Sequence, residues 1–352
     1  MQTMTLNALL LLPFIIASTI SAKYSSDTSN KDLNKNYKEK NQSIDMQMAY
    51  NAPARIDVKG SWDISLSGSF IYWKAQEENL ELGKANTSST SNPSFLVNSD
   101  FEYKPGFKVG LGTNIFHDNW NLYLEWTRIH GSTNTHKNID TSIVTLSYPT
   151  WVNVLSSSYT KFSGSWKNKY DMLDLELGRP YYLGTKLTVK PHFGARWGWI
   201  DQKFNVEYDR SVGPRTSHNK SDSWLLGPRT GFDSNWIFGH GFKFIGNAAT
   251  SLFYQRLKTT HITSIDGFGG ESLSKTYSMY NPYLEIAAGL GWGTYFHNNS
   301  YHFNIELLWE EHTLWNQNTM AQLNSYDYNP RYNGNIGNLT YGGFTITMQL
   351  DF

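Results

Sequence analysis

The sequence predicts an all-β protein, a transmembrane antiparallel up-and-down β-barrel of about ten strands. Apolar and polar residues alternate along one segment after another, and the connections between these segments alternate between long and short. The composition agrees, because 15% of the 352 residues are aromatic and only 17% are charged, while the mean hydropathy is -0.49. Abundant apolar residues without long apolar runs are typical of membrane barrels, whose strands alternate between lipid and lumen. A large secreted β-sandwich or lectin is the alternative.

Residues 1–22 predict a cleaved signal peptide. Their apolar stretch, Ala8 to Ala17, is too short to cross a bilayer as a helix, and the small residue Ala22 precedes the expected cleavage site. The positive charge that usually precedes such a stretch is missing. Residues 23–59 are polar and lack apolar periodicity, which predicts a disordered periplasmic segment. Entry of this segment into the barrel lumen is the alternative.

The alternating pattern covers residues 60–352, which are the predicted barrel. Successive side chains of a strand point to opposite faces, so each segment has one apolar and one polar face. Two further strands within residues 141–160 would make twelve, and that number is left open. The ten predicted strands are 61–74, 104–116, 120–130, 162–178, 185–200, 221–238, 242–258, 278–295, 300–313 and 338–352.

The connections between these strands favour a membrane barrel over a sandwich. Long loops on one side and tight turns on the other are typical of meander barrels in the outer membrane, where the short turns face the periplasm. The barrel must close, because an open sheet edge in hydrocarbon leaves backbone groups unpaired. Aromatic residues near both ends of the strands predict two girdles at the membrane interfaces. Trp62, Trp73 and Trp166 are among the residues expected there.

Several short segments resemble a known family. Gly342 to Phe352 alternates up to a final Phe352, which resembles the insertion signal of outer-membrane barrels and implies assembly by the barrel assembly machinery. Together with the segments below, it resembles the Legionella-type pore-forming outer-membrane family, related in style to chlamydial major outer membrane proteins, over about residues 60–352. The resemblance implies a multi-pass outer-membrane location and a porin-like role, and it carries no ligand residue. The other segments are Gly60-Ser61-Trp62, Leu173 to Arg179, Lys190 to Gly194 and Gly227 to Gly231.

Charged residues that alternate with the lipid-facing set are expected in the lumen. Acidic and basic residues fall on different strands, which predicts a transverse field across a water-filled constriction. The alternative is a set of salt bridges that fills a narrow lumen, since ten strands lie nearer the filled limit than the sixteen of an open porin. The candidates for the constriction are Glu125, Asp174, Lys190, His192, Arg196, Arg229, Glu285, Glu306 and Glu310.

These observations predict a pore for passive diffusion of ions and small hydrophilic solutes, with a plugged structural barrel that acts as an adhesin through its surface loops as the alternative. Catalysis is disfavoured, because the candidate rim residues Asp201, His261 and Asp266 form no Asp-X-Asp or Asp-X-His motif. No cofactor or metal is expected, and the equal numbers of acidic and basic residues give no sign of nucleic-acid binding. The expected partners are outer-membrane lipid, lipopolysaccharide and the assembly machinery; a homo-oligomer and a host surface are left open.

Overall fold

The computed structural model is described for most of the region that the sequence assigns to the barrel. The described residues are 52–60, 62–87, 94–115, 119–140, 144–152, 159–210, 213–265, 270–320, 322–324, 331–333 and 336–352. No helix in this part of the chain is long and apolar enough to span a bilayer.

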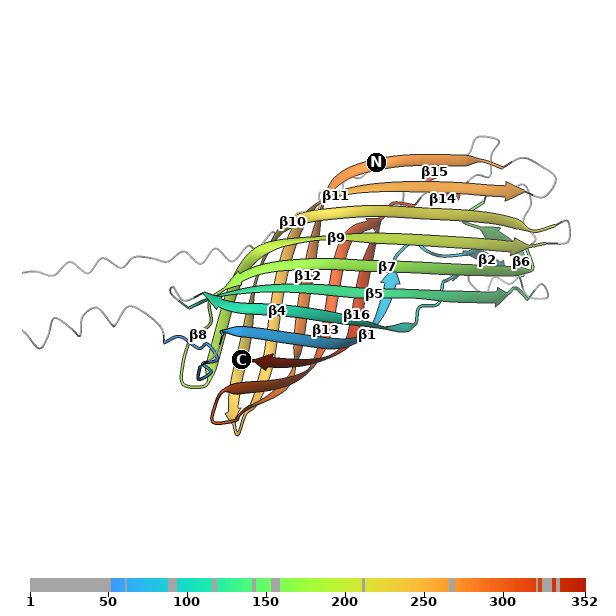
Figure 1. Cartoon of the computed structure of the whole chain (residues 1–352). Coiled ribbons are helices and arrows are strands. Elements are labelled where there is room, and N and C mark those ends of the chain that lie inside the picture. Colours follow the sequence, from blue (N-terminus) through green and yellow to red (C-terminus); the bar gives the residue numbers. More distant parts are fainter. Residues whose placement is uncertain are drawn as a thin grey trace, which may run out of the picture. The chain divides into compact units, whose positions relative to one another are not determined.

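Ten antiparallel strands form a closed barrel, as the sequence predicted (Figure 1). Each strand pairs with the next barrel strand along the chain, and the first pairs with the last from Ser65–Asp351 to Glu77–Leu339. Ile64 and Phe352 close the seam with two backbone hydrogen bonds of 3.0 and 2.9 Å. The barrel strands are β1 (Ile64–Glu77), β4 (Tyr103–Ile115), β5 (Trp120–Asn138), β7 (Lys161–Gly178), β9 (Leu187–Asp209), β10 (Arg215–Gly239), β11 (Phe242–Ile265), β12 (Ser272–Phe296), β13 (Tyr301–Asn318) and β16 (Gly337–Asp351).

The remaining strands lie outside the barrel wall or at its edge. β8 (Tyr181–Tyr182) adds to β9 near a short turn. β2 (Gly83–Thr87) pairs with both β3 (Phe95–Val97) and β6 (Val144–Pro149) in a separate sheet at the loop end. The possible extra hairpin in residues 141–160 therefore supplies β6 to this loop sheet, and the twelve-stranded alternative is wrong. A further small pair joins β14 (Gln322–Asn324) and β15 (Arg331–Asn333).

Most barrel strands extend further towards the loop end than the alternation predicted. β9 ends at Asp209 instead of residue 200, and β11 ends at Ile265 instead of residue 258. Two of the five predicted long loops are therefore short connections between long strands. The apolar outward residues stop where the membrane stops, but the backbone ladder continues in water, where outward side chains are polar. A search for apolar alternation misses this continuation.

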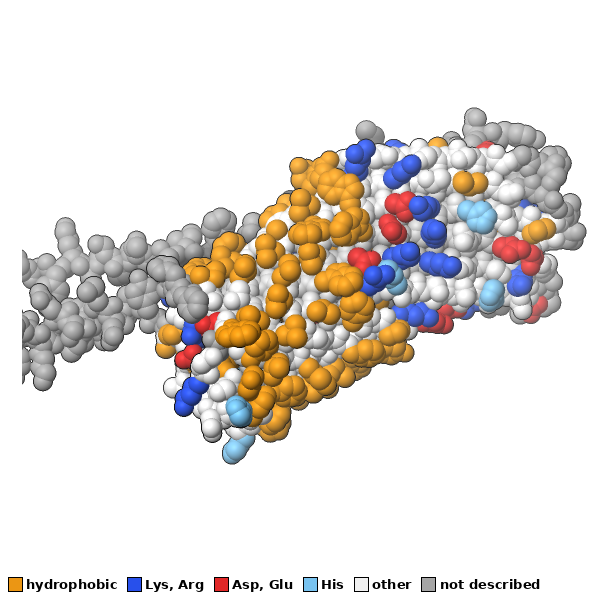
Figure 2. Space-filling view, in the orientation of Figure 1, with side chains coloured by type: hydrophobic (Ala, Val, Ile, Leu, Met, Phe, Trp, Pro, Cys, Tyr) orange, Lys and Arg blue, Asp and Glu red, His pale blue; other side chains and the backbone are white. Residues whose placement is uncertain are grey.

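The two faces of the wall exchange polarity along each strand, which β9 illustrates. Nearer the short turns, Phe193 faces outward and Arg196 faces the lumen. Nearer the loops, Lys203 faces outward and Phe204 is fully buried inside. Figure 2 shows the same change on the surface, where an apolar band gives way to a zone with many charged side chains. The band is the membrane-spanning part, and the zone beyond it stands outside the membrane.

Two expected girdle residues face the other way. Trp73 and Trp166 are 0% and 3% exposed and belong to the hydrophobic core inside the barrel. Their neighbours Tyr72 and Ser165 point outward, so strand alternation turns both indoles inward. The interpretation of Trp73 and Trp166 as membrane anchors is therefore wrong, whereas Trp62 is 77% exposed at the short-turn end.

Residues 52–60 lie against the short-turn end of the barrel. Pro53 bridges to Tyr181, the Ala54 amide donates to the Pro180 carbonyl at 3.1 Å, and Val58 is buried. For residues 52–59 the structure thus differs from the expected disorder, because backbone bonds tie them to the turns. The expected signal peptide and residues 23–51 lie outside the described residues and stay predictions.

Candidate functional site

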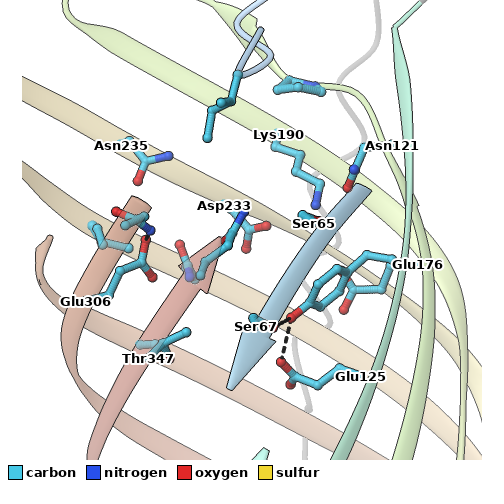
Figure 3. Close-up of a pocket in the computed structure, with 18 of the residues that line it drawn as sticks. Ser65, Ser67, Asn121, Glu125, Glu176, Lys190, Asp233, Asn235, Glu306 and Thr347 are labelled. Carbon is cyan, nitrogen blue, oxygen red and sulfur yellow. Dashed lines mark hydrogen bonds between the residues drawn. The ribbon is translucent and has the colours of Figure 1, made fainter. Parts of the chain in front are cut away.

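The membrane-spanning half of the lumen contains a polar cavity of about 570 Å³. It reaches from Asp63 and Phe352 at the short-turn end to Tyr170 and His312 near the middle of the barrel. Figure 3 shows charged and amide side chains directed into this space from several strands. The lining follows from alternation, since each side chain opposite a lipid-facing residue must point into the lumen.

The predicted constriction residues do face the lumen. Seven of them line the cavity directly, and Phe352 lies at its mouth; the seven are Glu125, Lys190, Arg196, Arg229, Glu285, Glu306 and Glu310. The other two, Asp174 and His192, are buried in the wall beside them.

The charges are paired across the lumen and do not form separate sectors. Arg196 on β9 binds Asp174 on the adjacent strand, with Nη2 2.5 Å from Oδ2, and also contacts Glu285 on β12. Arg229 on β10 contacts Glu176 and places Nη2 2.7 Å from Glu285 Oε2. Two strands separate β9 from β12, so Glu285 ties distant parts of the wall together. The expected transverse field is replaced by a network of buried ion pairs.

A second group of ion pairs contains a residue that the sequence interpretation missed. Lys108 on β4 lies 2.7 Å from Glu310 Oε2 and 4.0 Å from Glu125 Oε1, and it is nearly buried. The signal was present, because Lys108 alternates with the lipid-facing Phe107 and Val109. The third lumen pair joins Lys243 to Glu306 at 2.8 Å.

Hydrogen bonds across the barrel close the cavity above these charges. The hydroxyls of Tyr170 on β7 and Tyr283 on β12 are 2.8 Å apart, and the Tyr283 hydroxyl is 3.1 Å from His312 Nδ1. Asn168 on β7 donates to the Tyr341 hydroxyl on β16 at 2.6 Å. The Tyr170–Tyr283 and Asn168–Tyr341 bonds each span several strands of the wall, so these side chains meet near the barrel axis.

Beyond this layer the lumen is a hydrophobic core. Nine of the ten barrel strands contribute buried apolar side chains to one cluster. The loop sheet adds Ala85 and Val97, and Leu82 directly precedes β2. Tyr208 donates to the Leu82 carbonyl at 2.7 Å, and Trp151 packs edge-on against Phe204. The described parts of the loops between β1 and β4 and between β5 and β7 therefore enter the outer end of the barrel and are packed there.

The candidate enzyme residues do not converge. Asp201 points outward from β9, whereas His261 on β11 points inward and bonds to Asn219. Burial lowers the pKa of His261 to about 4. Asp266 lies outside the described residues. Among the described residues, no group of three or more His, Asp or Glu side chains is arranged to hold a metal.

The closed strand meander, apolar outer band and polar lumen define an outer-membrane β-barrel. The chain matches, over residues 53–352, the family described as Legionella pneumophila major outer membrane protein precursor, and it belongs to that family. The resemblance and the outer-membrane location expected from the sequence are confirmed.

Solved structures with a similar fold differ widely in their described roles. The outer membrane protease OmpT from Escherichia coli is 12% identical, with 85% of this chain and 99% of its own covered and a TM-score of 0.45. Ail, the attachment invasion locus protein of Yersinia pestis, is 12% identical over 82% and 97%, with a TM-score of 0.24. The toluene transporter TodX of P. putida is 10% identical over 82% and 89%, with a TM-score of 0.32. No curated protein sequence matches this chain. Likenesses this distant carry no argument about activity.

Proposed function

We propose that this protein is a closed outer-membrane barrel that holds a rigid, water-exposed extension above the membrane and presents it to the surroundings of the cell. This corresponds to the plugged, surface-binding alternative from the sequence and not to the open diffusion pore. The proposal includes no catalytic role, and the two rim candidates that the structure describes, Asp201 and His261, lie on opposite faces of the wall. Export through cleavage after Ala22 and insertion by the assembly machinery belong to the same proposal.

The packed outer half of the lumen carries this proposal. An open porin needs a water-filled path, and a ten-stranded barrel has an interior only slightly wider than one that its own side chains fill. Here Phe204, Tyr208 and Phe253 are fully buried in that interior. Side chains from almost every strand meet there in one core.

Planar-bilayer conductance of the refolded protein tests the proposal. We expect no conductance steps from the wild type in 1 M KCl. The loops and the extension would then act by binding other molecules. Binding of this protein to a host-cell surface should therefore depend on residues beyond the apolar band. Regular single-channel steps from the unmodified protein would contradict the closed barrel and restore the diffusion pore.

A gated pore is the second candidate, and the polar cavity favours it. A fully structural barrel has no need of a 570 Å³ cavity lined by Lys190, Glu125 and Glu306 in its membrane-spanning half. Part of this closure comes from a loop and not from the wall. This part consists of Leu82 and Val97 with strands β2 and β3, and mutagenesis can remove it.

A loop replacement separates the two candidates. A short Gly-Ser linker in place of residues 79–101 removes β2 and β3 from the outer end of the barrel. A gated pore should then conduct, whereas the closed barrel should not, because wall residues such as Tyr170 and Tyr283 still meet inside. The same linker in place of residues 321–335 is the control for loop loss.

A further inference from the structure

Three lysines stand side by side on the outer surface of the barrel. Lys167 on β7 lies directly opposite Lys203 on β9, and Lys203 lies directly opposite Lys220 on β10. All three side chains are exposed and face outward. Residues opposite each other in antiparallel strands have Cβ atoms about 5 Å apart, and like charges at that distance destabilise the pair.

The chain itself offers little compensation for this repulsion. Lys220 contacts Asp222 on its own strand. Among the residues that the structure describes, none forms an ion pair with Lys167 or Lys203. The next row of paired outward residues towards the membrane has two more lysines at its ends. It runs across the strands in the order Lys169, Asp201, Asp222, Lys258.

The position of the lysines relative to the membrane follows from the same strands. Trp199 and Trp224 are paired, outward-facing and exposed, which places them in the aromatic girdle. Lys203 lies four residues beyond Trp199, roughly 13 Å along the strand at about 3.3 Å per residue. With a strand tilt near 40°, that is about 10 Å above the girdle, the height of lipid headgroups.

The lysines occupy one side of the barrel only. The outward positions that continue the same row on either side are neutral, with Ser132 on β5, Thr260 on β11 and Ser274 on β12. Figure 2 shows the charged side chains gathered directly beyond the apolar band. Nonspecific attraction to an anionic membrane surface does not require lysines gathered on three neighbouring strands, whereas a binding site for one lipid does.

We propose that Lys167, Lys203 and Lys220 bind the phosphate groups of a phosphorylated glycolipid in the outer leaflet, whose acyl chains lie against the apolar band below. Lys169 and Lys258 complete the patch, and Trp199 contacts the sugar or the upper acyl carbons. Phosphate oxygens between the lysines replace the missing counter-charges and remove the cross-strand repulsion. The partner is a single lipid class held on one side of the barrel, independent of whether the lumen conducts.

The experiment compares three proteins in neutral detergent. They are the wild type, a patch variant with Lys167→Gln, Lys203→Gln and Lys220→Gln, and a control with Lys84→Gln, Lys137→Gln and Lys161→Gln. The control removes the same charge from positions further from the membrane. Each protein is titrated with lipid A carrying both phosphates, with dephosphorylated lipid A and with inorganic phosphate, and tryptophan fluorescence and thermal unfolding report binding.

We expect the affinity of the patch variant for bisphosphorylated lipid A to fall on the order of 100-fold, since each basic residue near an anionic surface contributes about fivefold. The control should bind like the wild type, and dephosphorylated lipid A should bind both weakly. Without lipid, the patch variant should unfold at the same temperature as the wild type or higher, because repulsion is relieved. Equal losses in patch variant and control, equal binding of dephosphorylated lipid A, or equally tight binding of inorganic phosphate would each overturn the proposal. A lower unfolding temperature of the lipid-free patch variant would also overturn it.

Discussion

The two halves of this barrel use one strand pattern in opposite senses. In the membrane half, apolar side chains such as Phe193 face out and charged ones such as Arg196 face in. In the outer half, Lys203 faces out and Phe204 faces in, so this half is arranged like a water-soluble β-protein. The backbone pairing runs without interruption from one half to the other. The solvent around the wall, and not the sheet geometry, decides which face is apolar.

The difference also separates two ways of filling a narrow lumen. The membrane half is held by ion pairs around a polar cavity, and the outer half by aromatic packing. Ion pairs leave water-sized gaps and depend on every partner being present. Packed aromatic rings exclude water and stabilise through buried area. Changes in the two halves should therefore act through different physical causes.

The largest expected effect comes from the ion pairs. Replacing Arg196 and Arg229 by Ala leaves Asp174, Glu176 and Glu285 without their cations. Each orphaned carboxylate should cost about 3–5 kcal/mol in the free energy of unfolding, because a buried charge without a partner is expensive. The urea midpoint of refolded protein measures this.

A matched double change on the outer surface gives the control. Arg128 and Arg256 face outward. Arg256 is exposed, and Arg128 is half-buried in a solvent-accessible ion pair with Asp171 at 3.6 Å, so their replacement by Ala should alter the free energy of unfolding by about 1 kcal/mol or less. Equal losses in the free energy of unfolding would mean that the ion pairs in the lumen add nothing to stability, and that only the removal of two positive charges matters.

A change in the aromatic core should follow in size. Phe204→Ala removes a fully buried ring from the outer half and should cost about 3–5 kcal/mol, since the rigid wall cannot collapse into the cavity. Lys203→Ala, on the opposite face of the same strand, should cost less than about 0.5 kcal/mol. Urea unfolding of both variants is the measurement. A smaller cost for Phe204 than for Lys203 would contradict the inverted arrangement.

The third effect depends on pH and is smaller. Burial lowers the pKa of His261 to about 4, whereas an unfolded histidine titrates near 6.5. Between these values the unfolded chain binds more protons, so stability falls as the pH drops from about 6.5 towards 4. The loss should amount to roughly 1–3 kcal/mol, and His261→Asn should remove it from the pH profile of unfolding. A variant profile identical to that of the wild type would show that His261 is not buried in its neutral form.

The membrane half could be predicted from the sequence because its alternation is visible in apolar residues. The barrel, its strand order and the inward direction of Arg196 and Glu285 follow from that pattern. The outer half could not be predicted in this way. Phe204 and Lys203 still alternate, but beyond the membrane the apolar side chain faces the lumen and the charged side chain faces water. Trp73 was misassigned for a different reason. An indole near a strand end suggests an interface anchor, although alternation with the outward-facing Tyr72 already turns Trp73 towards the lumen.

Long-range partners also escaped the sequence. Alternation places Arg196 and Glu285 in the lumen, but β10 and β11 separate their strands and only the closed barrel brings them together. The entry of Leu82 into the outer lumen has no local signal either, because it depends on the shape of the barrel opening. The sequence therefore left open a wet constriction or a lumen filled by salt bridges, and the structure has ion pairs beneath an aromatic core.

Cysteine labelling along β9 tests the exchange of faces most directly. The chain has no cysteine, so single variants at Phe193, Lys203 and Phe204 each carry one thiol. With the folded protein in liposomes and a membrane-impermeant maleimide, Lys203→Cys should react rapidly. Phe193→Cys should be protected by lipid, and Phe204→Cys by the aromatic core, until urea unfolds the protein. Rapid labelling of Phe204→Cys in the folded protein would show an open, water-filled outer lumen and would contradict the closed barrel.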